Sequence, residues 1–215
     1  MFGKKEPPSR SQLIAEADRA RARGKLKRAI QGYRQALALE PKDPAVHVKL
    51  APLLARTKEP EAALQSFREA AQGHLDKGFA DKALAVYTQA AETFPTQTGL
   101  WQQVARMNVE RGRRADAVRI LLRGRFSLRR RNERAEAIIL LKEALALDPT
   151  LFTPRLDLAR LLAQRHSRAE AMVLLEPMEK ALTGPQLRQV RWTMLRVAPG
   201  VGAGWRWLRA AVVGR

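Results

Sequence analysis

The sequence predicts an all-α protein, and three observations lead to that prediction. The 215 residues are 46% hydrophobic and 28% charged, which is typical of a globular chain rather than a disordered one. Ala, Leu, Arg, Glu and Gln dominate, and these residues favour helices, whereas the alternating runs of Val, Ile and Thr that would predict strands are absent. From Arg10 onward, apolar residues recur three and four positions apart almost without pause, which is the spacing of one helix face.

Breaks in this spacing mark several of the boundaries between ten expected helices. The breaks fall at Gly24, Pro41, Gly78, Pro95, Gly112, Asn132 and Pro149. Proline has no N–H and disfavours helix in the residue before it, so the Pro positions are natural helix ends. The expected helices are 10–22, 25–39, 44–57, 60–76, 79–93, 98–111, 114–130, 133–147, 152–165 and 168–182.

One helical sequence pattern occurs three times along the chain. It reads "RGKLKRAIQGYRQALALEP" at residues 23–41, "KGFADKALAVYTQAAETFP" at 77–95 and "RNERAEAIILLKEALALDP" at 131–149. In the first copy Ala29, Tyr33 and Ala36 fall on one helical face, and Pro41 follows the last turn. Small residues let two helix axes approach closely while the aromatic ring fills the space beside them.

This pattern resembles the tetratricopeptide repeat, a helix–turn–helix unit of about 34 residues. In that family the second helix carries a small residue, an aromatic, another small residue and a terminal proline, which Ala29, Tyr33, Ala36 and Pro41 match. Glu16 stands where the family's first helix has Leu. The resemblance covers about residues 10–181 and implies a right-handed α-solenoid of about ten antiparallel helices, closed by a C-terminal capping helix or two.

The copies are spaced 54 residues apart, which is longer than one family unit. A second unit begins at Pro44, so a third unit is due to begin near residue 78. Gly78 instead already occupies the turn between the two helices of that third unit. We therefore expect a three-helix super-repeat in which helix 60–76 serves as the second helix of one unit and the first of the next. The positions expected to be equivalent include Ala63, Ala117 and Ala171; Leu50, Val104 and Leu158; and Tyr33, Tyr87 and Leu141.

Three parts are expected along the chain. Residues 1–9 are a disordered basic tail, residues 10–182 form the repeat domain, and residues 183–215 form a C-terminal cap that ends in a short amphipathic Trp/Arg helix. The N-terminus lacks the apolar core of a secretory signal, and no stretch approaches the length of a membrane span. These features predict a cytoplasmic protein, with peripheral attachment at the inner face of the membrane as an alternative.

A search for catalytic patterns predicts a protein that is not an enzyme. There is no cysteine, which excludes thiolate chemistry and disulfides. His47 and His74 fall where the repeat needs bulky packing residues, and His166 falls at a turn. No phosphate-binding loop, nucleophile elbow or paired metal ligands are found, so we expect no catalytic residue, no cofactor and no metal site.

The charge points instead to an acidic partner. The formal net charge is +19, from 40 basic and 21 acidic residues, and such an excess bears on partners rather than on fold. Three basic regions stand out: one around residues 19–28, one at 123–134 and one from Lys180 to the end. Lys49 occupies one place of the family's carboxylate clamp, but Gln103 and Asp157 at the equivalent places leave that clamp incomplete.

The candidate partner-binding residues follow from these regions and from first-helix positions expected to face a groove. The C-terminal four suit either docking on the end of the solenoid or an anionic membrane surface. The candidates are Lys49, Arg106, Arg160, Arg123, Arg129, Arg130, Arg131, Trp205, Arg206, Trp207 and Arg209.

The leading hypothesis is a non-enzymatic adaptor or scaffold that binds an acidic peptide or helix of a protein partner. An RNA- or DNA-associated helical-repeat protein is the second hypothesis, because the charge would attract phosphates. Attachment to an anionic membrane through the C-terminal helix is the third. None of the three uses a small-molecule substrate.

Overall fold

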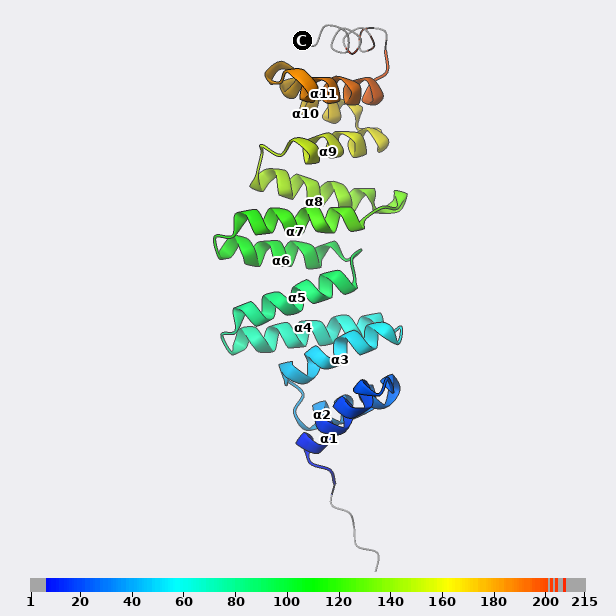
Figure 1. The fold of residues 1–215 in the computed structure, drawn as a ribbon, viewed down its shortest axis with the longest axis vertical. Helices are drawn as coiled ribbons and strands as arrows, with labels where there is room; N and C mark the ends of the chain where they lie inside the picture. The colour runs from blue at the N-terminus through cyan, green and yellow to red at the C-terminus, as the bar shows by residue number, and fades with distance from the viewer. Residues whose placement is uncertain (1–6, 201, 203, 205–206, 208–215) are drawn as a thin grey trace, which may run out of the picture. The chain divides into compact units, whose positions relative to one another are not determined.

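The computed structural model describes residues 7–200 together with residues 202, 204 and 207. Within this part the chain folds into eleven α-helices and one short 3₁₀-helix, with no strand (Figure 1). The helices are α1 (Arg10–Ala22), α2 (Leu26–Leu39), α3 (Pro44–Arg56), α4 (Pro60–Asp76), α5 (Ala80–Thr93), α6 (Thr98–Glu110), α7 (Arg114–Ser127), η1 (Arg131–Glu133), α8 (Arg134–Leu147), α9 (Phe152–Gln164), α10 (Arg168–Ala181) and α11 (Gly184–Val197).

The all-α prediction is confirmed, and nine of the ten expected helices agree with the structure to within one residue at each end. The exception is α7, which ends at Ser127 rather than at 130. Leu128 takes an extended conformation there and is only 3% exposed, so burial of its side chain turns the chain out of the helix. Helix α11 is the additional helix expected after the repeat domain.

The helices form two compact units, Met1–Val104 and Ala105–Arg215. In the first unit α1 packs on α2, α2 on α3, α3 on α4 and α4 on α5, while α3 also contacts α5 (Figure 1). In the second unit α7 packs on α8, α8 on α9, α9 on α10 and α10 on α11, while α9 also contacts α11. Among α1–α5 of the first unit and α7–α11 of the second, each helix therefore lies against the next one, and α3 and α9 also lie against the helix after that.

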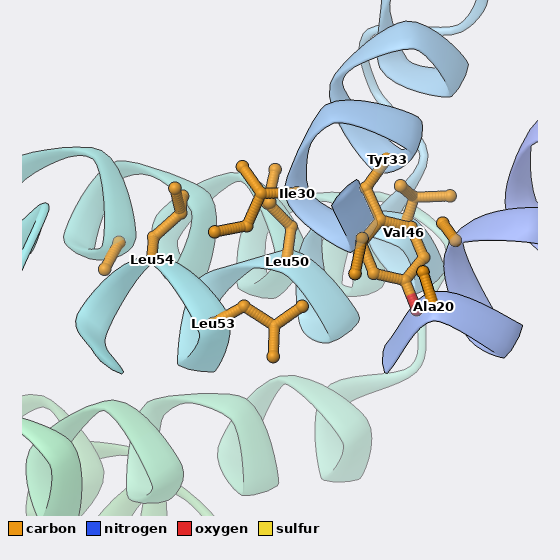
Figure 2. Close-up of a cluster of buried hydrophobic side chains, with 10 residues drawn as sticks. Ala20, Ile30, Tyr33, Val46, Leu50, Leu53 and Leu54 are labelled. Atoms are coloured by element: carbon orange, nitrogen blue, oxygen red, sulfur yellow. The ribbon is translucent and has the colours of Figure 1, made fainter. Parts of the chain in front are cut away.

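Small side chains are buried at the repeating positions of the helices. Ala63, Ala117 and Ala171 are fully buried, as their predicted packing role requires. Tyr33 and Leu141 are also buried, whereas Tyr87 at the equivalent place is only half-buried. In the first unit Ala63 belongs to a core to which α1, α2, α3 and α4 contribute, and Figure 2 shows Ala20, Tyr33 and Val46 of this core grouped together. The members labelled there are Ala20, Ile30, Tyr33, Val46, Leu50, Leu53 and Leu54.

A side chain in the first turn of a helix anchors the end of the preceding helix. The ring nitrogen Nε2 of His47 donates to the carbonyl of Pro41 at 2.8 Å. The indole nitrogen of Trp101 donates to Pro95 at 3.0 Å, and the guanidinium of Arg155 donates to Pro149. These three contacts are 54 residues apart. They accord with the expected interval, while the sharing of helices between units stays a prediction.

Turns with a left-handed residue follow the same interval. Lys58, Gly112 and His166 have φ angles of 63°, 72° and 66°. Glycine adopts this conformation without strain, whereas a residue with a Cβ atom pays a conformational cost. His166 was expected at a turn, and the structure confirms that placement.

Candidate partner-binding surface

Lys49 is bound to a carboxylate of its own chain. Its Nζ lies 2.8 Å from Oδ2 of Asp18 on α1, and the hydroxyl of Tyr33 on α2 donates to Oδ1 of the same carboxylate at 2.6 Å. Burial alone would raise the pKa of Asp18, but the hydrogen bonds from Lys49 and Tyr33 outweigh it and the pKa lies below its ordinary value. Burial, followed by the hydrogen bond to Asp18, raises the pKa of Tyr33.

The second unit holds a similar inter-helix pair with the charges exchanged. Arg125 on α7 forms an ion pair with Asp157 on α9: its Nη2 donates to Oδ1 at 3.0 Å, and its Nε lies 2.8 Å from Oδ2. One turn further along α9, Arg160 donates to the hydroxyl of Thr193 on α11 at 3.1 Å. Lys49 and Arg160 therefore both take part in contacts between helices, and Arg106 is the first-helix candidate that is exposed without such a contact in the described part of the chain.

The second basic region forms a loop between α7 and α8, which we call the basic connector (residues 126–133). Its backbone is held at two residues, Leu128 and Arg130. Leu128 is buried and its carbonyl accepts a hydrogen bond from Arg125 at 3.1 Å. The carboxylate of Glu133 accepts from the backbone N–H of Arg130 at 2.8 Å. The connector therefore presents a held backbone rather than a loose charged loop.

The arginine side chains of the connector face solvent. Arg129, Arg130 and Arg131 are all exposed, and none of them has an acidic partner among the residues that the structure describes. Phe126, at the start of the connector, is 64% exposed, and Arg123 lies exposed one turn earlier on α7. A row of cations thus adjoins an exposed aromatic ring, which is a combination that can receive a segment carrying both acidic and apolar side chains.

Arg125 belongs to this basic region in the sequence, but in the structure its side chain is not exposed as those of its neighbours are. Its side chain is 15% exposed and is held between Asp157 and the connector. The sequence offered no local signal for this role, because Asp157 is 32 positions away. Arg125 therefore positions the surface, and its neighbours supply the exposed charge.

Of the four C-terminal candidates the structure describes only Trp207. Its ring lies 5.4 Å from the ring of Trp192 on α11, at an interplanar angle of 48°, and its side chain is half-buried. Trp205, Arg206 and Arg209 lie outside the described residues. The ring contact places Trp207 against Trp192, while docking of the C-terminal segment as a whole stays a prediction.

The histidines occupy the structural places expected of them. His47 is 9% exposed and makes the hydrogen bond to Pro41 described above. His74 is half-buried, and this burial together with the nearby charges of Lys82 and Lys77 lowers its pKa. Over the part of the chain described by the structure, no three His, Asp or Glu residues gather as a metal site would require. No helix in that part is both long and apolar enough to span a bilayer.

An all-α stack of this kind defines a helical-repeat protein, a class that binds partners over extended surfaces. Residues 17–58 match the family model described as TPR repeat. That segment holds the buried set Ala29, Tyr33 and Ala36, followed by Pro41. Residues 17–58 therefore have the pattern of a tetratricopeptide repeat, a unit that generally serves in protein–protein interaction.

Several solved structures are similar to this chain. The structure of MamA is 12% identical and aligns over 80% of this chain and 90% of that chain, with a TM-score of 0.36. A tetratricopeptide repeat protein from Parabacteroides merdae is 16% identical over 96% of this chain and 93% of that one, with a TM-score of 0.34. PilF of Pseudomonas aeruginosa is 15% identical over 96% and 93%, with a TM-score of 0.31. No curated protein matches the sequence.

Proposed function

We propose that this protein is a non-enzymatic adaptor that binds an acidic segment of a partner protein through the basic connector. The observation that carries the proposal is the run of exposed Arg129, Arg130 and Arg131 on a backbone held by Leu128 and Arg125. A held loop loses little conformational entropy when a partner binds, so more of the interaction energy appears as affinity.

The chemistry of the connector suits a carboxylate-rich protein segment. Guanidinium groups bind carboxylates through paired hydrogen bonds, which fixes the orientation of the partner as well as attracting it. The net charge of +19 adds a long-range attraction that speeds encounter with an acidic partner. Phe126 adds an apolar contact, so a segment that alternates acidic and apolar residues would use both parts of the surface.

Nucleic acid and membrane remain the competing partners. Proteins that bind single strands stack successive bases on several spaced aromatic rings, whereas the connector offers Phe126 alone. A membrane arm would use the C-terminal tryptophans, and Trp207 packs on Trp192 instead. These observations favour a protein partner over the other two.

A defined peptide tests the proposal. The probe is a fluorescein-labelled peptide of alternating glutamate and leucine, and the readout is its fluorescence anisotropy on titration with the full chain. The variant R129Q/R130Q/R131Q should bind it about tenfold more weakly, since each exposed charge pair contributes a fraction of 1 kcal/mol.

The matched control is R113Q/R165Q/R168Q, which removes the same charge from exposed positions of the same unit. This control should keep near wild-type affinity. Equal losses in the two variants would show that the peptide responds only to net charge, and the proposal would then be wrong. Phe126→Ala should weaken binding of the glutamate–leucine peptide but not of a peptide of glutamate and glycine.

A further inference from the structure

A second basic surface lies at the first helical hairpin, in the other unit of the chain. The ends of α1 and α2 enclose a pocket of about 190 Å³, which we call the α1–α2 pocket. It lies where α1 ends and the turn through Gly24 leads into α2. Its lining residues are Glu16, Arg19, Ala20, Arg23, Lys25 and Arg28.

The charges of the α1–α2 pocket are unbalanced. Arg19, Arg23, Lys25 and Arg28 converge on it, against the single carboxylate of Glu16. None of the four cations has an acidic partner in the described part of the chain. Arg21 in the same run points elsewhere and pairs with Asp18 at 3.6 Å. The pocket therefore carries an excess of positive charge that the described residues do not neutralise, and an anion from outside the chain would balance it.

A second hollow adjoins this pocket along the α1–α2 interface. It encloses about 150 Å³ and shares Glu16 and Arg28 with the first. Gly32 forms part of its wall, at a point where an added Cβ atom would lie 2.9 Å from Cβ of Ala17. The wall is otherwise apolar or uncharged, from Leu13, Gln31 and Gln35. An extended chain with one anionic group in the pocket could place its neighbouring residues here.

We propose that the α1–α2 pocket binds the phosphate group of a phosphorylated protein segment. A phosphate monoester carries a charge of about −1.5 to −2 at neutral pH and offers three acceptor oxygens. That matches several converging guanidinium groups better than a carboxylate does, because one carboxylate carries a single charge and two acceptors. The pocket has room for one such group, and the adjoining hollow receives the segment on one side of it.

The lining of the two hollows favours a peptide over a nucleic acid. No aromatic residue lines either of them, and single-strand binding surfaces depend on aromatic stacking for much of their affinity. The inference stands apart from the proposed function, because it concerns a different unit, a different set of residues and a different anion.

The test uses two degenerate peptide pools with the full chain. One pool carries a fixed central phosphoserine between randomised neighbours, and the other carries serine in its place. The phosphoserine pool should bind at least about tenfold more tightly, as expected for charge-assisted hydrogen bonds to a dianion. Inorganic phosphate should compete with it, and Glu16→Gln should tighten its binding.

Two variants locate the effect. R19Q/R28Q should bind the two pools equally, while the control K42Q/R56Q, which removes the same charge from exposed positions of this unit, should keep the preference. Equal binding of the two pools by the wild-type chain would overturn the proposal, as would equal loss in both variants. Tighter binding of 5′-phosphorylated single-stranded DNA than of the phosphoserine pool would assign the pocket to nucleic acid instead. R129Q/R130Q/R131Q should leave this preference unchanged, so failure here and failure of the connector proposal can be told apart.

Discussion

The ammonium group of Lys49 lies 2.8 Å from the carboxylate of Asp18 and ties α3 to α1. In the second unit Arg125 and Asp157 tie α7 to α9 with the basic residue on the earlier helix. The same kind of bridge between alternate helices is thus made with either polarity. We infer that an ion pair between these helices stabilises each unit, whichever of the two helices carries the basic residue.

Exchanging the charges of Asp18 and Lys49 should therefore restore part of the stability that reversing the charge of Lys49 alone removes. Lys49→Asp places two carboxylates together and should lower the free energy of unfolding by about 1–2 kcal/mol, mostly through like-charge repulsion at a half-exposed site. The double variant D18K/K49D should recover part of that loss. Urea unfolding followed by circular dichroism measures both, and a double variant less stable than K49D would contradict the account.

The low pKa of Asp18 predicts an acid-sensitive contribution to stability. Since its folded-state pKa lies below the ordinary value of the carboxyl group, the carboxylate stabilises the fold at pH values above the unfolded pKa of about 3.9. That contribution is lost as the pH falls through the folded-state pKa. Asp18→Asn should therefore be less stable than wild type at neutral pH, and the difference should shrink on acidification. A difference that stays constant from pH 7 to about pH 3 would argue against this assignment.

Substitutions at two alanines of α5 distinguish the effect of close packing from that of helix propensity. Ala83 is completely buried, whereas Ala85 on the same helix is exposed. Ala83→Leu should destabilise the protein by about 1–3 kcal/mol or more, because a larger side chain forces the helices apart. Ala85→Leu changes the same residue type at an exposed place and should stay within about 0.5 kcal/mol. Similar losses in both variants, measured by thermal unfolding, would show that the helices do not pack as described.

Glycine should be favoured at two turns that lack it. Lys58 and His166 have positive φ angles at places equivalent to Gly112. Lys58→Gly and His166→Gly should each relieve about 1 kcal/mol of backbone strain, partly offset by the greater freedom of glycine in the unfolded chain. A net stabilisation of a few tenths of a kcal/mol or more is expected from urea unfolding. Gly112→Ala should destabilise the protein, and a neutral result there would contradict the strain that we assign to these turns.

The helices could be predicted because their signals are local. Apolar spacing, turn glycines and terminal prolines act within a few residues, so nine helices have the expected ends. Helix α7 ends earlier than expected, just before Leu128, whose backbone is extended and whose side chain is buried. The fully buried places of Ala63, Ala117 and Ala171 follow from the same repeat pattern.

The candidate site was predictable only in part, because pairing between helices has no local signal. Lys49 and Arg160 looked like free ligands in the sequence, yet each contacts a residue more than 30 positions away. The run from Arg129 to Arg131 is exposed as a charged loop would suggest. The convergence of Arg19 and Arg28 on one pocket depends on how α1 and α2 cross, which only the structure gives.

The most direct test of the central claim is site-specific cross-linking at the basic connector. A photo-reactive amino acid replaces Arg130 in the full chain, and in a control chain it replaces Arg113, which is exposed on the same unit. After irradiation in cells, mass spectrometry identifies whatever is joined at each position. We expect conjugates at position 130 whose partner peptides are rich in Asp and Glu, and few of these at position 113. Conjugates to nucleic acid at position 130, or the same protein conjugates at both positions, would contradict the proposed function.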